Sequence, residues 1–574
     1  MRFAIVIFLS CLALAAQVQV GVSNPNVPSV EQPPTRPEDL GAVEGSVFNA
    51  ATGDPVKKAA VVITRTDIVP NRGAPQQSYS TATDAAGRFA MKDIEPGKYR
   101  MTVSRNGFVT MTYGARGPTR PGTTLALDRA QKLKDVNFRL TPHGVIAGRI
   151  LDEDGEPLPF VSVQLVQFQY RQGRQQMNMV GGAGNTAGTT NDLGDYRIFG
   201  VAPGKYYLRA TARLTQVVGP AIQVRSTNGQ PEEDYVPTYY PGTTNTANAA
   251  PIEVGSGALV SGINFTLSKM ATVHIKGSIA NIPASGRRQI QVMLLPRNQP
   301  FFGGLRPNFA DAKGNFDLPN VTPGQYVLSA SMNDGTRNYS ASMPVDVGNS
   351  NLENVSLTIS SGVDFSGRIL IEGDTQQNLS NVSISLRPRD SNGMVFNGVP
   401  QARVKDDQSF QVQNAGAEIF EMALFGLPDG FYVKSIKSGE TDVLTSGLDV
   451  TRGAPQPVEV LVSPHAGVLS GAVQNSSTGQ PASGATVVLV PQEKERLQQQ
   501  QYYKTVTTDQ NGSYTLKSLT PGEYKAFAWE DLEPAAYMDP DFMKPLESKG
   551  EPVTIRESDQ KTLSLTMIPA DTPR

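Results

Sequence analysis

The sequence has almost no cysteine and very little histidine. Its 574 residues include one cysteine, Cys11, and three histidines, His143, His274 and His465. Without cysteine beyond residue 11, the rest of the chain has no thiol nucleophile and no disulfides, so its stability must come from packed cores. A zinc peptidase needs closely spaced histidine and glutamate ligands, and neither H-E-x-x-H nor H-x-x-E occurs. We therefore expect no metal site, no cofactor and no catalytic residue, although a carboxylate pair for glycoside hydrolysis would leave no local motif.

The chain also lacks an excess of charge of either sign. Its 51 basic residues nearly balance its 53 acidic residues, which gives a formal net charge of −2. This balance gives no reason to expect nucleic acid or an anionic membrane surface as a partner.

Long apolar runs are missing everywhere except at the start of the chain. Arg2 is followed by the run FAIVIFLSCLALAA, residues 3–16, which ends in small residues suited to cleavage. We therefore predict a signal peptide over residues 1–16 and a secreted, periplasmic or cell-surface mature protein. Lipid attachment at Cys11 is the less favoured alternative. No later run approaches about 18 apolar residues, so we expect no membrane span in the mature chain.

Glycine and proline, by contrast, are abundant, with 54 and 42 residues and no collagen-like period. Such a composition favours short strands joined by many turns. Residues 17–40 are rich in proline and are predicted to form an extended linker.

One motif recurs along the chain. It reads DAAGRFAMKDIEPGKY from Asp84, NDLGDYRIFGVAPGKY from Asn191, DAKGNFDLPNVTPGQY from Asp311 and DQNGSYTLKSLTPGEY from Asp509. In each copy thirteen residues separate the first residue from the glycine of the Pro-Gly pair. A fifth copy is degenerate, with Asp406, Phe410 and Val412 matching its first half. Self-similarity of this kind is the signature of repeated structural units.

Each part of the motif has a structural explanation. The first Asp or Asn can cap a turn, and the glycine three residues later can take a positive φ. The following residues alternate like a half-buried strand. The tyrosine two residues after the Pro-Gly pair can bury its ring and return its hydroxyl to the backbone, as in the tyrosine corner of β-sandwiches.

Similar segments flank each copy. A strand–turn–strand pattern precedes it, beginning near residues 41, 144, 272, 362 and 467, and a short alternating segment such as LKDVNFRL closes most units. We predict an all-β chain of five immunoglobulin-like or transthyretin-like β-sandwich modules. Their ranges are 41–141 for module 1, 142–269 for module 2, 270–360 for module 3, 361–464 for the degenerate module 4, and 465–574 for module 5.

The G-x-V/I start, the D-x-x-G-x-F/Y turn and the P-G-x-Y bend resemble those of carboxypeptidase regulatory-like domains. That family is a transthyretin-like β-sandwich, also grouped with starch-binding-like folds, and the resemblance extends over nearly the whole chain after residue 40. It implies an accessory domain without peptidase activity, and it makes carbohydrate a plausible ligand class.

Aromatic residues in the segments that differ between modules are the candidate ligand-binding residues. They are Tyr113 in module 1, Tyr235, Tyr239 and Tyr240 in module 2, and Trp529 and Tyr537 in module 5. Flat rings on a rigid β-scaffold can stack on sugar faces or pack at protein interfaces. The alternative is that these rings form small cores beneath long loops.

Two acidic segments are also ambiguous. Residues 152–156, DEDGE, could bind calcium but are more simply a hairpin turn. The acidic loop over residues 529–552 is expected to be solvated, or else a cation or partner site.

These features predict a monomeric, non-catalytic binding or scaffold protein outside the cytoplasm. Its partner would be a polysaccharide or a cell-surface protein. The alternatives are a structural spacer or adhesion stalk, and an accessory subunit of an outer-membrane transporter or hydrolase. Fold analogy alone is a weak warrant for choosing among them.

Overall fold

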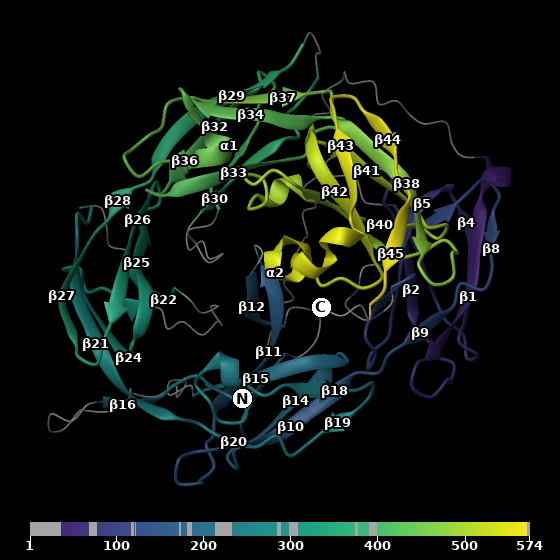
Figure 1. Cartoon of the computed structure of the whole chain (residues 1–574). Helices are drawn as coiled ribbons and strands as arrows, with labels where there is room; N and C mark the ends of the chain where they lie inside the picture. Colours follow the sequence, from purple (N-terminus) through teal and green to yellow (C-terminus); the bar gives the residue numbers. More distant parts are fainter. Residues whose placement is uncertain are drawn as a thin grey trace, which may run out of the picture.

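The computed structural model describes residues 36–570 except 68–76, 116, 118–119, 121, 172–173, 181–185, 213–231, 284–288, 298–307, 374–376 and 390–398. The predicted signal peptide, residues 1–16, and most of the predicted linker lie outside the described residues. The regular elements of the described chain are mostly strands with a few short helices (Figure 1), which confirms the predicted all-β class. None of its helices is both long and apolar enough to cross a bilayer.

Module 1 is a sandwich of two sheets. Its elements are η1 (Pro37–Asp39), β1 (Gly41–Asn49), β2 (Ala60–Arg65), β3 (Ser78–Ala82), β4 (Arg88–Ile94), β5 (Gly97–Ser104), β6 (Met111–Thr112), β7 (Leu125–Leu127), β8 (Lys132–Leu133) and β9 (Phe138–Leu140). One sheet runs β4-β1-β8, with β9 also on β1, and the other runs β3-β2-β5-β6, with β7 on β5. Strands β8 and β9 pair with β1 in parallel, whereas β4 pairs with it antiparallel.

Module 2 repeats this arrangement and extends one hairpin. Its elements are β10 (Gly144–Leu151), β11 (Val161–Arg171), β12 (Arg174–Met179), β13 (Ala187–Thr189), β14 (Asp195–Val201), β15 (Gly204–Ala212), β16 (Glu232–Tyr235), β17 (Thr238–Tyr239), η2 (Thr246–Asn248), β18 (Ile252–Val254), β19 (Leu259–Val260) and β20 (Phe265–Thr266). Strand β16 does not join the sheets of its own module. It pairs instead with β21 (Lys269–Ala280), the first strand of module 3, and so ties the two modules together.

Modules 3 and 4 are also two-sheet sandwiches. The rest of module 3 comprises β22 (Gln291–Pro296), β23 (Asn308–Phe309), β24 (Asn315–Val321), β25 (Gly324–Asn333), β26 (Asn338–Val347), β27 (Leu352–Thr358) and β28 (Ser360–Ser361). Module 4 comprises β29 (Val363–Ile371), β30 (Ser383–Pro388), β31 (Gln401–Arg403), β32 (Ser409–Ala415), β33 (Ile419–Phe425), β34 (Tyr432–Ser438), β35 (Thr441–Asp442), α1 (Val443–Ser446), β36 (Leu448–Asp449) and β37 (Val458–Ser463). In module 4 the full-length strand β37 takes the place beside β29 that short strands occupy in module 1.

Module 5 carries a helical excursion on its sheet. Its elements are β38 (Gly467–Asn475), β39 (Thr486–Pro491), η3 (Gln500–Tyr502), β40 (Lys504–Thr507), β41 (Ser513–Leu519), β42 (Gly522–Trp529), η4 (Ala536–Met538), α2 (Pro540–Met543), η5 (Lys544–Lys549), β43 (Glu551–Ile555), β44 (Gln560–Thr562) and β45 (Leu565–Ile568). The segment predicted as a solvated acidic loop is therefore compact, and that prediction is wrong. Its residues Leu532, Phe542 and Leu546 are buried, because they cover the outer face of β42.

Buried apolar side chains gather into one large cluster within each predicted module. The clusters span residues 43–140, 146–267, 273–359, 365–462 and 469–567. Two smaller clusters lie outside these cores, one under the helical excursion of module 5 and one on the β11–β12 hairpin of module 2.

The repeated motif adopts the predicted geometry. The side-chain oxygen of Asp509 accepts hydrogen bonds from the amides of Asn511 and Ser513, each at 2.9 Å. Gly512 has a φ of 74°. Equivalent pairs of hydrogen bonds are made by Asp84, Asn191 and Asp311.

The tyrosine of the motif is buried and bonded to the backbone as predicted. The hydroxyl of Tyr524 donates to the carbonyl oxygen of Thr520 at 2.8 Å. The same bond, to the carbonyl four residues earlier, is made by Tyr99, Tyr206 and Tyr326.

The degenerate copy in module 4 differs from the predicted match at its first residue, whereas Phe410 and Val412 take the strand positions predicted for them. The turn bonds join Lys405 to Ser409 and Gln408 to Lys405, and Gln408 takes the positive φ of 63°. Lys405, not Asp406, therefore occupies the position of the first aspartate, and Asp407 supplies a carboxylate that caps Ser409. The sequence match was misleading because two acidic residues lie next to each other in this turn.

The modules follow one another around a closed ring (Figure 1), in which yellow module 5 lies beside purple module 1. Consecutive modules are joined by hydrogen bonds, which include His143 N to Gly107 O, Gly362 N to Asn338 O and Ala466 N to Gly430 O. Contacts between modules 1 and 5 close the ring, and they include the pair of Arg120 with Asp531 and the hydrogen bond from Gln510 Nε2 to Ala126 O at 3.5 Å. Helix α2 lies inside the ring near β12, where Tyr170 of module 2 packs edge-on against Phe542.

Candidate functional site

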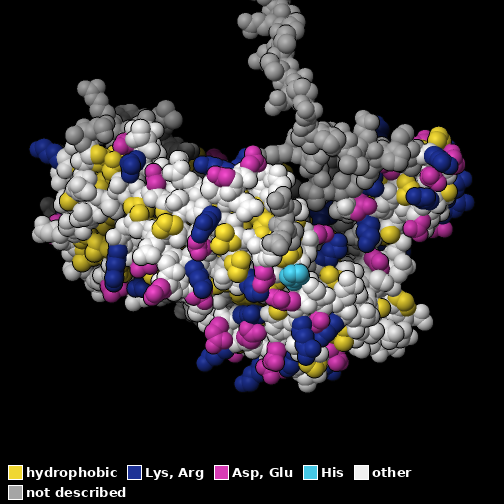
Figure 2. Space-filling model, turned by 90° about the horizontal axis from the view of Figure 1, so that it is seen from above, with side chains coloured by type: hydrophobic (Ala, Val, Ile, Leu, Met, Phe, Trp, Pro, Cys, Tyr) yellow, Lys and Arg dark blue, Asp and Glu magenta, His cyan; other side chains and the backbone are white. Residues whose placement is uncertain are grey.

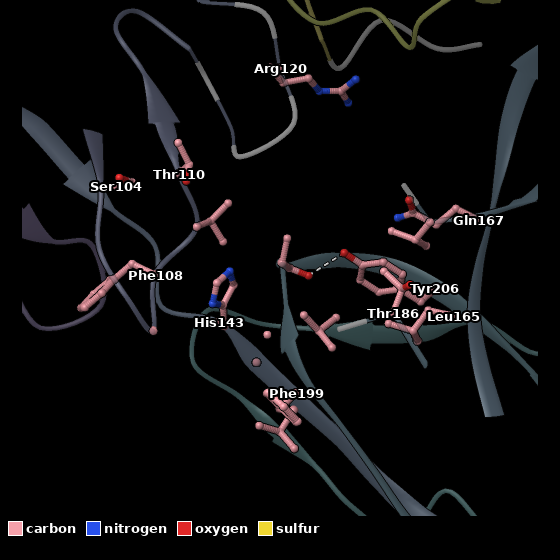
Figure 3. Close-up of a pocket in the computed structure, with 18 of the residues that line it drawn as sticks. Ser104, Phe108, Thr110, Arg120, His143, Leu165, Gln167, Thr186, Phe199 and Tyr206 are labelled. Carbon is pink, nitrogen blue, oxygen red and sulfur yellow. Dashed lines mark hydrogen bonds between the residues drawn. The ribbon is translucent and has the colours of Figure 1, made fainter. Parts of the chain in front are cut away.

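The candidate site is a cavity of about 1140 Å³ where modules 1, 2 and 5 meet (Figure 3). Module 1 contributes the turn after β5, and module 2 contributes β11 and the β14–β15 turn. Module 5 contributes Glu533 and Pro534, which follow β42. The cavity therefore depends on the ring arrangement, because the segments that line it are separated by hundreds of residues.

The module 1 wall carries two cationic side chains. Lys58 precedes β2 and Arg105 follows β5, and these two strands are paired, so both residues lie at the same end of the sheet. The Arg105 guanidinium donates to the carbonyl oxygen of Lys58 at 3.4 Å. Neither residue makes an ion pair with any acidic side chain of the described chain.

His143 stands at the junction of modules 1 and 2. Its amide donates to the carbonyl oxygen of Gly107 at 3.0 Å, which fixes the junction against the module 1 turn. Its ring projects into the middle of the cavity (Figure 3). Burial lowers the pKa of the His143 imidazole, which favours the neutral ring.

The module 2 wall supplies amide groups and aromatic rings. Gln167 points into the cavity (Figure 3), and its side-chain nitrogen donates to Lys205 O at 3.0 Å, so the amide oxygen is presented as an acceptor. Phe168 packs edge-on against Tyr207 with ring centroids 5.0 Å apart. Tyr206 is the corner tyrosine of the module, and its hydroxyl donates to Ala202 O within the cavity wall.

The module 5 side is held by a bidentate ion pair. Arg120 contacts both carboxylate oxygens of Asp531, at 2.7 Å and 2.9 Å, and also donates to Leu532 O at 3.2 Å. This geometry places Glu533 and Pro534 over the cavity. Planar guanidinium–carboxylate pairs of this kind combine charge attraction with fixed orientation.

The cavity can bind a polar ligand by hydrogen bonding and by contact with aromatic rings. Among the described residues, no group of three or more His, Cys, Asp or Glu side chains is arranged as a metal site. The DEDGE segment is a turn, in which the Asp152 carboxylate accepts from the amides of Asp154 and Glu156.

The predicted tyrosines of module 2 lie elsewhere. Tyr239 is 3% exposed and lies beside the buried Arg209, whose charge opposes the rise that burial causes in the tyrosine pKa. Tyr240 packs edge-on against Phe265 at 5.9 Å. Tyr235 donates to Glu153, and the Lys269 ammonium lies 4.9 Å from the centre of its ring.

The predicted aromatic residues of modules 1 and 5 are also packed. Tyr113 is half-buried against Phe138, with ring centroids 6.2 Å apart. Trp529 is 3% exposed and stacks on Phe527 at 5.1 Å. Tyr537 is half-buried and lies 5.6 Å from Tyr503.

The expectation that these rings are exposed platforms is therefore wrong for Tyr239, which packs against the β11–β12 hairpin, and for Trp529, which the helical excursion covers. None of the six predicted residues is among those that line the cavity. Sequence reasoning missed Lys58, Arg105 and Gln167, because they come together only through strand pairing and module docking. His143 was noticeable as a rare histidine at a module junction, and that was the one available signal.

Comparison with solved structures finds only distant likeness. The minor pilin of Streptococcus agalactiae is 10% identical, with 40% of this chain and 96% of that chain covered and a TM-score of 0.22. The major pilin subunit of Bacillus cereus is 13% identical, with 74% and 99% covered and a TM-score of 0.13. These values carry no inference about function.

Comparison with curated protein sequences finds no significant match. Comparison with family models does identify modules 1 and 5. Residues 42–141 and 468–567 both match the carboxypeptidase regulatory-like domain. The match is narrower than the sequence resemblance implied, although modules 2 and 3 share the same capped turn and corner tyrosine. The chain thus contains two carboxypeptidase regulatory-like domains, one at each of the two modules that meet to close the ring.

Proposed function

We propose that this protein is a non-catalytic, extracytoplasmic binding scaffold, and that it binds an oligosaccharide segment in the cavity between modules 1, 2 and 5. The observation that carries the proposal is the cavity itself, about 1140 Å³ in volume and built from three modules. Ligand sites of small molecules usually occupy about 300–1,000 Å³, so this cavity has room for a few sugar rings.

The lining chemistry supports a sugar over an apolar ligand. Amide and hydroxyl groups of Ser104, Thr110, Gln167 and Thr186 surround the cavity, and sugar hydroxyls can both donate to and accept from such groups. Phe108 and Phe199 add aromatic surface, against which the apolar faces of sugar rings can pack.

The ring arrangement favours a binding scaffold over the alternative of an extended stalk. A stalk gains reach by placing its modules end to end, whereas here the last module returns to the first. An accessory subunit of a larger surface assembly is the second candidate. The extracytoplasmic setting rests on the apolar run at residues 3–16.

Binding of the mature full-length chain to a panel of polysaccharides and oligosaccharides tests the proposal. We expect at least one saccharide to bind, and the double variant Gln167→Ala/Gln169→Ala to weaken that binding about tenfold or more, the equivalent of about 1.4 kcal/mol. Gln175→Ala is the matched control, because Gln175 is exposed on β12 and does not line the cavity.

Two results would contradict the proposal. One is the absence of binding across the whole panel. The other is binding that is unchanged in the cavity double variant but lost in Tyr240→Ala. That result would place the binding site at the module 2 segment that contains Tyr240.

A further inference from the structure

Positively and negatively charged side chains are unevenly distributed around the cavity. Its module 1 wall carries Lys58 and Arg105, which we call the cationic end, and His143 adjoins them at the junction. Among the described lining residues Glu533, on the opposite module 5 side, is the one carboxylate.

Arg120 also lines the cavity, but its positive charge is paired with a carboxylate and is not available to a ligand. Its guanidinium is engaged by both oxygens of Asp531 and by a backbone carbonyl. Lys58 and Arg105, in contrast, make no ion pair with the acidic residues that the structure describes. Two positive charges at the cationic end are therefore left for a ligand.

The face seen in Figure 2 does not share this character. Its basic and acidic side chains are interspersed without a broad patch of one sign. The cavity wall thus differs from this face in carrying cations without nearby acidic partners. Inside a partly enclosed site, opposite charges attract more strongly than they do in open water.

The two cations are also placed to act together. The Arg105 guanidinium contacts the Lys58 backbone, so one negatively charged group could reach both side chains. Arginine binds carboxylate and sulfate groups with paired hydrogen bonds, and lysine adds a point charge. The neighbouring amide and hydroxyl groups would then bind the uncharged part of the same ligand.

We infer that the cavity selects an acidic oligosaccharide, whose carboxylate or sulfate group lies between Lys58 and Arg105. This inference rests on the proposed function, because it names the class of saccharide that the same cavity takes. A neutral oligosaccharide would gain no attraction from the two cations, so its affinity is expected to be lower.

Calorimetric titration of the mature full-length chain tests this selectivity. The ligands are an oligouronate, the neutral oligosaccharide of the same linkage and length, and its sulfated form, with inorganic sulfate as a fourth arm. We expect the acidic oligosaccharides to bind at least about tenfold more tightly than the neutral one, and their affinity to fall as salt is raised. Comparison of the uronate and sulfated arms identifies which anion the site prefers.

Substitutions at the cationic end should remove the selectivity. Lys58→Asn suits the positive φ of 56° at this position, and Arg105→Gln removes the second charge. Each should reduce binding of the acidic ligand about tenfold and leave binding of the neutral ligand nearly unchanged. Arg105→Lys should retain part of the selectivity, and Lys57→Gln is the control, because Lys57 is exposed and does not line the cavity.

The outcomes separate the inference from the proposed function. Equal affinity for neutral and acidic oligosaccharides would overturn the inference but would still support the proposal that the cavity binds a saccharide. Binding of inorganic sulfate alone, with no saccharide bound, would overturn both. Unchanged circular dichroism in each variant establishes that a loss of binding reflects the lost charge rather than misfolding.

Discussion

The guanidinium of Arg120 binds both carboxylate oxygens of Asp531, although 411 residues separate them in the sequence. The pair is partly shielded, with side chains about a third exposed, and Arg120 also reaches the carbonyl oxygen of Leu532. Module 1 and module 5 thereby become neighbours. This contact helps to join two distant parts of the chain and lies at one side of the cavity.

Breaking this pair should loosen the ring. Arg120→Ala and Asp531→Ala each leave one charge without its partner, and truncating one member of such a pair costs more than an exposed ion pair is worth, on the order of 1–3 kcal/mol. We expect a larger radius of gyration in small-angle X-ray scattering and weaker saccharide binding. The reversed pair Arg120→Asp/Asp531→Arg should recover part of the compact form.

A matched control separates ring closure from a general loss of charge. Arg88→Ala removes an exposed ion pair with Asp84 that lies wholly within module 1, so it should leave the scattering profile unchanged. An unchanged profile in the Arg120 and Asp531 variants as well would show that other contacts hold the ring.

The sequence predicted local geometry well and long-range assembly poorly. The capped turn at Asp509 and the corner tyrosine Tyr524 follow from bonds within four residues, so short spacing was enough to predict them. The Arg120–Asp531 contact has no local pattern, because it depends on how whole modules dock.

Trp529 illustrates a signal that was present but misinterpreted. Strand β42 alternates through Lys525 and is then continuously buried from Ala526 to Trp529. Phe527 and Trp529 face away from the module core and are covered by the helical excursion that includes Phe542. A continuous apolar run is typical of a strand buried on both faces, and here it indicated a second core rather than an exposed platform.

Loss of the corner hydroxyl should weaken module 5 locally. Tyr524→Phe keeps the buried ring and removes the 2.8 Å bond to Thr520 O, which should cost about 0.5–1.5 kcal/mol. Hydrogen exchange of the β42 amides in the full chain should accelerate accordingly. Tyr537→Phe is the control, since its hydroxyl makes no hydrogen bond within the described residues; equal acceleration in both variants would contradict a special role for the corner bond.

Alkaline pH should act on the same tyrosine. Burial raises the pKa of Tyr524 from 10.0 to about 12, so the unfolded chain loses this proton first as the pH rises. The resulting stability is fully present below pH 10 and is lost between pH 10 and 12. In thermal unfolding of the full chain, Tyr524→Phe should therefore lose less stability over this range than the unaltered protein, and an identical decline would contradict the assignment.

Gly277 on β21, beside β27, should not tolerate a side chain. A Cβ on Gly277 would lie 2.0 Å from Val355 O, because β21 and β27 approach each other closely in parallel. Gly277→Ala should destabilise module 3 by at least about 1–3 kcal/mol, measured as a lower midpoint in thermal unfolding. Gly348→Ala in the same module has open space around its Cβ and should be nearly neutral; similar losses in both variants would contradict the steric argument.

Acidification should weaken the junction that His143 occupies. Burial lowers the pKa of its imidazole below the usual histidine value of about 6.5, so the unfolded chain binds this proton first as the pH falls. The corresponding stability is fully present above pH 6.5 and decreases as the pH falls below it. His143→Gln removes the titrating group, and its melting temperature should decline less than that of the unaltered protein between pH 7.5 and 5.5. His465→Gln, altered at the module 5 junction, retains His143 and should keep the full decline; equal declines in all three proteins would show that His143 does not govern the acid response.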